Sequence, residues 1–366
     1  MKKITLNKYS FLFGLCFFIS CTSPKIDSLP TSSYETISFS QLKFKSLSNL
    51  LKPENTKYIL LRNDGAKELF GRIDKLKVKH DKIYILDTKL RSLTVYDLQG
   101  NFIGQIGRRG QGPKEYVNLS DFDVDDKGNV FVLDARLNKL LRYDKNYTCT
   151  DEVFLDFQAD VLATLANDSL LFGLSSWNTG KGKGYKIAKT DSEGNIAATS
   201  LTYDKYVDPG FWISMYMIAH TGNHLSYHQT IDNTIYLLSE NGRLDKGIVL
   251  DFGNENVPDK DKIDVERKLE NYDNYTIIRK ILAVSDNNIV GFIWQHRETK
   301  FFIINRSSHT CYLSDVIDDI DRRYGCGFSN GNIISYQDFE DEQLPDSVNE
   351  FIRNEGFVLT LQNISE

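Results

Sequence analysis

The chain has 366 residues, with 44 Lys and Arg against 50 Asp and Glu, 41% hydrophobic residues and 12% aromatic residues. This is enough apolar material for a large core, and it excludes a chain that is mostly disordered. The 7 prolines and 24 glycines exclude collagen-like and low-complexity classes, while the many Tyr and Phe residues favour an all-β protein. The net charge is −6 and no basic block follows residue 10, so we expect no nucleic-acid partner.

Residues 1–20 have the pattern of a secretory signal peptide. A lysine-rich start precedes an apolar run from Tyr9 to Ile19, about eleven residues, which is too short to span a bilayer comfortably. The sequence Phe18-Ile19-Ser20-Cys21 resembles a bacterial lipobox, with Phe18 where leucine is usual. We therefore expect Cys21 to carry lipid and to hold the protein to a membrane; the alternative is a plain signal peptide that is cut near Ser20.

Residues 21–33 are predicted to be a flexible polar tether, and residues 34–366 a single folded domain. Removal of residues 1–20 takes away three lysines and no acid, which changes the net charge from −6 to −9, so electrostatic attraction to anionic lipid is not expected. We expect the protein in the bacterial cell envelope, at the outer membrane, with the leaflet left open. Cys149, Cys311 and Cys326 form no C-x-x-C pattern, so we expect buried thiols or one disulfide.

A repeat determines the predicted fold. Residues 83–97 align with residues 130–144 at an offset of 47, with six of fifteen positions identical. Each copy reads as a β-hairpin that ends in Asp. Related strand ends recur through the chain, at residues 97, 144, 191, 239, 305 and about 362.

Six repeats of this length predict a six-bladed β-propeller with four-stranded antiparallel blades. The β-like segments Tyr34–Phe39 and Tyr58–Arg62 precede the first full hairpin. We expect an N-terminal strand to close the last blade beside Phe357–Leu361, so that both ends of the chain secure one sheet.

The segments Gly104–Tyr116 and Asp121–Asp134 resemble an NHL repeat. The chain is similar in particular to six-bladed propeller lipoproteins of the Bacteroidetes. This resemblance implies the fold rather than an activity. It also implies that Asp87 and Asp134 end strands and accept turn hydrogen bonds; the alternative is that they are carboxylates of the central channel.

Two segments depart from the period. The step from 239 to 305 is longer than the others, and residues 254–274 are expected to form an insertion on one face, with a short helix after Pro258. Residues 337–354 form a smaller, acidic elaboration. We expect solvated loops or short helices in both, with a binding lid as the alternative.

His220, His224 and His228 are four residues apart, which on a helix would form a metal-binding face. The turn signal Thr221-Gly222-Asn223 instead predicts a hairpin with His224 and His228 on one strand face. No catalytic residue, cofactor or metal ligand is therefore assigned, with calcium or zinc in the channel as the alternative.

Candidate ligand-binding residues lie in predicted loops. Arg108 and Arg109, in a glycine-rich segment, either bind an anion or simply connect two blades. Trp177, Trp212 and Tyr216 either stack on sugar rings or pack in the core.

These observations predict a membrane-anchored propeller outside the cytoplasm that binds a glycan, a peptide or an envelope protein. The alternative is a metal-dependent propeller enzyme of the lactonase or lyase type, acting on a sugar, lactone or peptide end in the central channel. A third hypothesis is a scaffold for an envelope complex.

Overall fold

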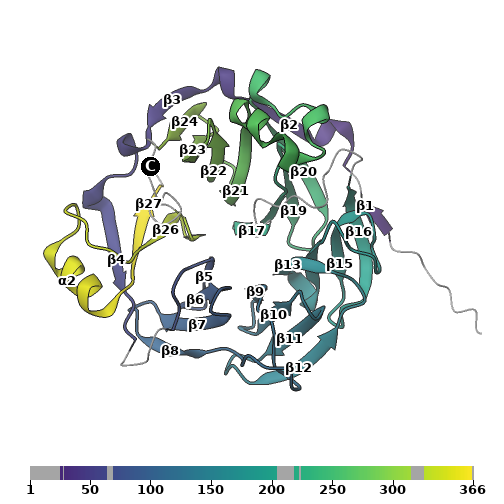
Figure 1. Ribbon diagram of the computed structural model, residues 1–366, viewed down its shortest axis with the longest axis vertical. Helices are drawn as coiled ribbons and strands as arrows, with labels where there is room; N and C mark the ends of the chain where they lie inside the picture. Colours follow the sequence, from purple (N-terminus) through teal and green to yellow (C-terminus); the bar gives the residue numbers. More distant parts are fainter. Residues whose placement is uncertain are drawn as a thin grey trace, which may run out of the picture.

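The computed structural model describes residues 25–27, 29–63, 69–203, 218–221, 224–314 and 325–364. These residues form six sheets arranged as the blades of a ring (Figure 1). The prediction of a six-bladed β-propeller is confirmed. None of the helices in these ranges is long and apolar enough to cross a membrane.

Each of the first five blades takes four consecutive antiparallel strands, listed from the channel outward. Blade 1 contains β5 (Lys75–Lys79), β6 (Lys82–Asp87), β7 (Ser92–Asp97) and β8 (Phe102–Gln105), and blade 2 contains β9 (Asp121–Val124), β10 (Val130–Asp134), β11 (Lys139–Tyr143) and β12 (Cys149–Phe154). Blade 3 contains β13 (Ala159–Thr164), β14 (Leu170–Leu174), β15 (Tyr185–Thr190) and β16 (Ile196–Thr202). Blade 4 contains β17 (Ile218–Thr221), β18 (His224–His228), β19 (Thr234–Ser239) and β20 (Leu244–Asp251), and blade 5 contains β21 (Thr276–Val284), β22 (Asn288–Gln295), β23 (Glu298–Asn305) and β24 (Thr310–Leu313).

Blade 6 joins the two ends of the domain. Its strands β25 (Gly327–Ser329), β26 (Asn332–Gln337) and β27 (Val358–Asn363) are completed by β4 (Thr56–Leu60), which pairs antiparallel with β27. The predicted closure of the last blade by an N-terminal strand is therefore confirmed.

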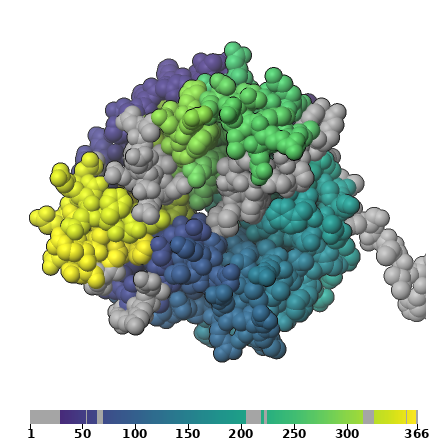
Figure 2. Space-filling view, in the orientation of Figure 1, coloured from purple at the N-terminus to yellow at the C-terminus, as the bar shows by residue number. Residues whose placement is uncertain are grey.

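The segment before β4 runs along the outer rim of the ring, where it is drawn in purple (Figures 1 and 2). Its strands β1 (Lys25–Asp27), β2 (Tyr34–Ser38) and β3 (Lys43–Ser46) add a parallel fifth strand to blades 3, 4 and 5. Edge strands present unpaired backbone groups, and these additions satisfy them. The segment from β1 to β4, called the strap below, thus contacts four consecutive blades, and it places β1 and η1 (Thr31–Ser33) within the range expected as a tether.

The hydrophobic core lies between the blades, where neighbouring sheets pack face to face. Tyr84 of blade 1, for example, lies 6.2 Å from Phe122 of blade 2, measured between ring centroids. Ile83 of blade 1 packs in the same cluster as Ile334 and Leu359 of blade 6. The alternation of strand side chains supplies apolar residues to both faces of each sheet, which explains why the strands are so uniformly buried.

The repeated aspartates build turns, as the NHL resemblance implies. Asp134 is fully buried, and its carboxylate accepts hydrogen bonds from the backbone N–H groups of Val117, Asn118, Arg136 and Leu137 at 2.6 to 3.1 Å. Asp87 occupies the same place in blade 1, with Gly71, Arg72 and Leu90 as donors. The six predicted strand ends all fall in, or directly after, the third strand of a blade.

Short helices fill the remaining connections. The predicted insertion contains η6 (Gly253–Glu255), η7 (Asp259–Asp261) and η8 (Val265–Asn274), and the acidic elaboration contains α2 (Asp346–Glu355). Four further single turns are η2 (Phe39–Gln41), η3 (Leu47–Asn49), η4 (Pro53–Asn55) and η5 (Ala166–Asp168). The three cysteines of the folded domain are free thiols, and Cys311 and Cys326 are buried.

The loops fall on two faces of the ring. Contacts between β5, β9 and β13 show that these inner strands run in the same direction along the channel. We call the face at which inner strands begin the entry face, and the face at which they end the exit face. The insertion precedes β21 and so lies on the entry face.

Candidate functional site

Three lysines of β5 line one wall of the channel. Lys75, Lys77 and Lys79 point the same way because side chains alternate along a strand. Lys75 Nζ donates to Asp121 Oδ1 at 2.6 Å, and Lys77 Nζ contacts the carboxylate of Asp123. These contacts connect the inner strands of blades 1 and 2.

The same two aspartates also hold blade 3. Asp121 Oδ2 accepts the backbone N–H of Leu162 at 2.9 Å, and Asp123 Oδ2 accepts the backbone N–H of Thr164 at 2.6 Å and its hydroxyl at 2.9 Å. Both carboxylates are almost wholly buried. Each is therefore satisfied by a lysine on one side and by backbone on the other, as buried charges require. These links position the channel wall.

His220 brings a titratable group of blade 4 to this wall. Its Nε2 lies 2.8 Å from Asp123 Oδ2. Burial lowers the pKa of His220, with the Lys77 ammonium acting in the same direction and Asp123 opposing it. Burial alone would raise the pKa of Asp123, but Lys77 and His220 hold it well below its ordinary value. The contact is thus a hydrogen bond between the Asp123 carboxylate and the Nε2 side of the His220 ring.

A cavity of about 660 Å³ occupies the channel beside this wall. His220 contributes to its lining, and 32% of the His220 side chain is exposed. On the opposite side β21 provides Lys280, whose Nζ lies 3.4 Å from the carbonyl oxygen of Gly325. The described ionisable groups of the lining comprise His220, four lysines and two aspartates. Three of the lysines form ion pairs, Lys75 with Asp121, Lys77 with Asp123 and Lys79 with Asp126. The excess positive charge of the described lining therefore comes from Lys280.

A smaller cavity of about 200 Å³ adjoins the channel at the exit face. It shares His220 and Lys79 with the larger one and adds His224 and Glu240. The two cavities therefore adjoin each other along His220 and Lys79. The volume of the larger cavity is in the range of small-molecule sites.

The predicted hairpin of histidines is present. His220 lies on β17, and His224 and His228 lie on β18, with Thr221 paired to His224. His224 and His228 lie on one face of β18, as predicted, because they are four residues apart on a strand. His220 is paired with Leu225 and so lies on the other face of the hairpin. Among the described residues no group of three His, Cys, Asp or Glu side chains could hold a metal ion.

The ligand-binding residues predicted from sequence lie elsewhere. Arg108 is 82% exposed and forms an ion pair with Glu115, in the connector between blades 1 and 2 that also contains Arg109. Trp177 is 48% exposed in the loop between β14 and β15. None of these three lines the channel cavity. Cys21, Trp212 and Tyr216 lie outside the described residues.

The lysine and aspartate pairs were not predicted, although the sequence contains a signal for them. Lys75 and Lys77 occupy the same repeat positions as Asp121 and Asp123, at an offset of 46. Alternating lysines on one inner strand and alternating aspartates on the next indicate a charged contact between adjacent blades. The signal becomes visible only when the repeat is extended to the strand before each hairpin.

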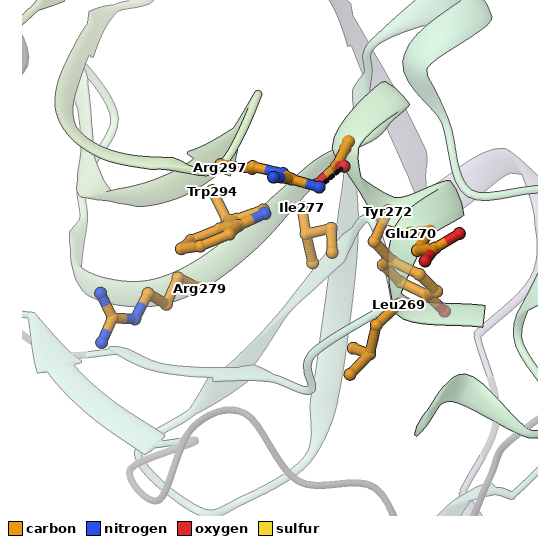
Figure 3. A pocket seen from close by; sticks show the side chains of 8 residues that line it. Leu269, Glu270, Tyr272, Ile277, Arg279, Trp294 and Arg297 are labelled. Carbon is orange, nitrogen blue, oxygen red and sulfur yellow. Dashed lines mark hydrogen bonds and ion pairs between the residues drawn. The ribbon is translucent and has the colours of Figure 1, made fainter. Parts of the chain in front are cut away.

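A second pocket, of about 440 Å³, lies on the entry face between η8 and blade 5 (Figure 3). The indole of Trp294 lies beside Ile277, and Tyr272 and Leu269 extend the apolar lining beyond it. Two guanidinium groups, of Arg279 and Arg297, flank the indole in this view.

Comparison with known proteins places the chain among uncharacterised domains. The family model of a domain of unknown function, DUF4934, matches residues 40–355. The solved structure of a "putative exported protein" of Bacteroides fragilis NCTC 9343 has 17% sequence identity and a TM-score of 0.74, covering 91% of this chain and 100% of that one. A DUF4221 member from Bacteroides vulgatus ATCC 8482 has 9% identity and a TM-score of 0.53, covering 86% and 99%. At these identities the likeness shows the fold alone. No curated protein matches the chain.

Proposed function

Because the chain belongs to the DUF4934 family, whose function is unknown, we propose a function from the geometry of its central channel. In this proposal the channel binds a small anionic ligand, and the protein lies in the bacterial cell envelope. The observation that carries this proposal is the cavity of about 660 Å³, whose described lining holds Lys280 in addition to three lysine–aspartate pairs. Cavities of this size bury most of the surface of a small ligand, and a few placed polar groups fix its orientation. A sugar acid or the carboxylate end of a peptide has suitable chemistry.

The rigidity of the wall supports this proposal. Three blades are joined in the absence of ligand by the contacts of Lys75, Lys77, Asp121 and Asp123. A preformed site does not have to order its side chains when it binds, which preserves affinity. Lys280 comes from the opposite wall, and we expect its ammonium group to contact the anionic group of the ligand.

Matched pairs of ligands test this proposal. Calorimetric titrations of protein starting at Thr22 would compare glucuronate with glucose, and acetyl-dialanine with its amide. We expect each acid to bind more tightly than its neutral partner. The Lys280→Gln substitution should reduce the affinity for the acid at least tenfold, which corresponds to about 1.4 kcal/mol. Lys127→Gln is the control, since Lys127 is exposed in an ion pair with Asp168. Equal binding of the acid and neutral members, or no effect of Lys280→Gln, contradicts the proposal.

Lipid on Cys21 is the second part of the proposal. The strap begins at Lys25, so an anchor at Cys21 would hold the rim of blade 3 near the membrane. The Cys21→Ala variant should move from the membrane fraction to the soluble fraction. If it stays in the membrane fraction, the anchor is wrong.

The His220 and Asp123 pair favours a second candidate function, an enzyme acting on a sugar, lactone or peptide end. An imidazole that is oriented by a buried carboxylate and faces a cavity has the geometry of a general acid or base. If the channel is catalytic, His220→Gln should abolish turnover while ligand binding remains. A metal-dependent form would require calcium or zinc, and elemental mass spectrometry of protein purified without chelators should then find about one ion per chain.

A further inference from the structure

The entry-face pocket is separate from the channel in both position and lining. Its described lining residues come from η8, from the first two strands of blade 5 and from the loop after them. None of them lines the channel cavity. The pocket is therefore a candidate for a ligand of its own.

We propose that this pocket binds a small amphiphilic anion, that is, a ligand with an apolar body and a carboxylate head. The apolar body would lie on Trp294, Ile277 and Leu269. The carboxylate would lie at the guanidinium groups beside the indole. The proposal is independent of the channel function.

The floor of the pocket is mainly apolar. Ile277 is 2% exposed, and the hydroxyl of Tyr272 donates to the Asp261 carbonyl oxygen at 2.7 Å, which leaves its ring as the lining. Leu269 is 51% exposed, although it is a large apolar residue. Covering exposed apolar surface with the body of a ligand is favourable by about 25 cal/mol per Å². A fully hydrated polar ligand would gain little here.

The charges of the pocket are distributed unevenly. Arg279 and Arg297 lie near the indole, whereas Glu270 lies beyond Tyr272 at the other end (Figure 3). Arg279 Nη1 donates to Thr299 Oγ1 at 2.7 Å, which fixes the guanidinium on the strand. Arg297 is ion-paired with Asp273 at the rim, so these two charges offset each other and Arg279 is the further cation at this end of the described lining. The indole end is thus the cationic end of the pocket.

A guanidinium group is suited to a carboxylate because its planar N–H donors match two carboxylate oxygens. The adjacent indole excludes water from that contact, which strengthens it. An amphiphile bound with its head at Arg279 and its body toward Leu269 satisfies both halves of the pocket. In the reverse orientation the carboxylate would meet Glu270.

Octanoate and octan-1-ol are the probes that test this inference, since they differ only in the head group. We expect octanoate to bind at least tenfold more tightly than octan-1-ol by isothermal titration calorimetry. The Arg279→Gln substitution should reduce the affinity for octanoate to that for octan-1-ol. Trp294→Ala should weaken both ligands, and Trp294→Phe, which keeps an aromatic ring and the fold, should weaken both less.

The chain offers matched controls on the same face. Arg108→Gln and Trp177→Ala change an exposed arginine and an exposed tryptophan outside the pocket, so octanoate binding should not change. Lys280→Gln should also leave it unchanged, which distinguishes this site from the channel. The inference is overturned if neither ligand binds, if the acid and the alcohol bind equally, or if Arg279→Gln has no effect.

Discussion

Replacing His228 with Gln should remove part of the pH dependence of stability below pH 6.5. His228 is 3% exposed on β18, and its Nε2–H donates to the Asp232 carbonyl oxygen at 3.2 Å, a bond that a glutamine amide can replace. Burial lowers the pKa of His228 to about 4; Asp232 opposes this change and Lys186 adds to it. In the unfolded chain the same imidazole titrates near 6.5.

The sign of the effect follows from proton binding. Between pH 6.5 and about 4 the unfolded chain holds a proton on His228 that the folded protein does not hold. The stability contributed by the neutral imidazole is therefore fully present above pH 6.5 and is lost as the pH falls toward 4. Since one pKa unit corresponds to about 1.4 kcal/mol, the whole loss is about 3 kcal/mol.

Urea unfolding between pH 7.5 and pH 4.5, followed by tryptophan fluorescence and circular dichroism, measures this loss. The free energy of unfolding of the unmodified protein, minus that of His228→Gln, should fall by about 2 to 3 kcal/mol over this interval. Groups common to both proteins cancel in the difference, including Asp160, whose pKa burial raises to about 6. His224→Gln is the control, because His224 is exposed on the same strand. Parallel pH profiles for His228→Gln and the unmodified protein would refute the reasoning.

Two further predictions concern the architecture. The Asp134→Ala substitution leaves four backbone N–H groups without their buried acceptor, so it should lower the free energy of unfolding by about 3 to 5 kcal/mol in the same urea assay. The Asp144→Ala substitution removes an exposed turn acceptor and should lower it by about 1 kcal/mol or less. If the two costs are equal, Asp134 is not the turn-building residue described above. Deleting residues 34–62 removes β2, β3 and β4 and should unfold the ring cooperatively; a truncated protein that melts like the intact one contradicts the strap's role.

The fold could be predicted because the repeat is long and its turns have specific chemistry. An aspartate such as Asp97 accepts the backbone N–H groups of Gln99 and Asn101, and this turn recurs at Asp191 with the same geometry. Such local signals mark the end of the third strand in blades 1 to 3. The closing strand was predictable because a ring needs one, but the parallel strands β1, β2 and β3 were not, since pairing along a rim depends on tertiary position rather than on local pattern.

The sites were less predictable for a physical reason. Lysine, tryptophan and arginine occur in solvent-facing loops as readily as in cavities, so Arg108 and Trp177 carried as much sequence signal as Arg279 and Trp294. What separates them is the neighbour supplied by a distant segment: η8 faces Trp294, and β17 brings His220 to Asp123. No spacing in a single sequence contains that information.

The residues that face the cavities come mainly from the blades in which the sequence repeat is least clear. Blades 1 and 2, where the repeat is clearest, provide Lys75, Lys77, Asp121 and Asp123, whose charges are largely used to join blades. Blades 4 and 5, where the repeat is blurred, provide His220, Lys280 and Trp294, which face the cavities. A position that must hold the next blade is constrained by the geometry of the ring, and a position that faces a cavity is not. Departures from the repeat are therefore where ligand specificity can change without loss of the fold, and mutagenesis should begin with blades 4 and 5.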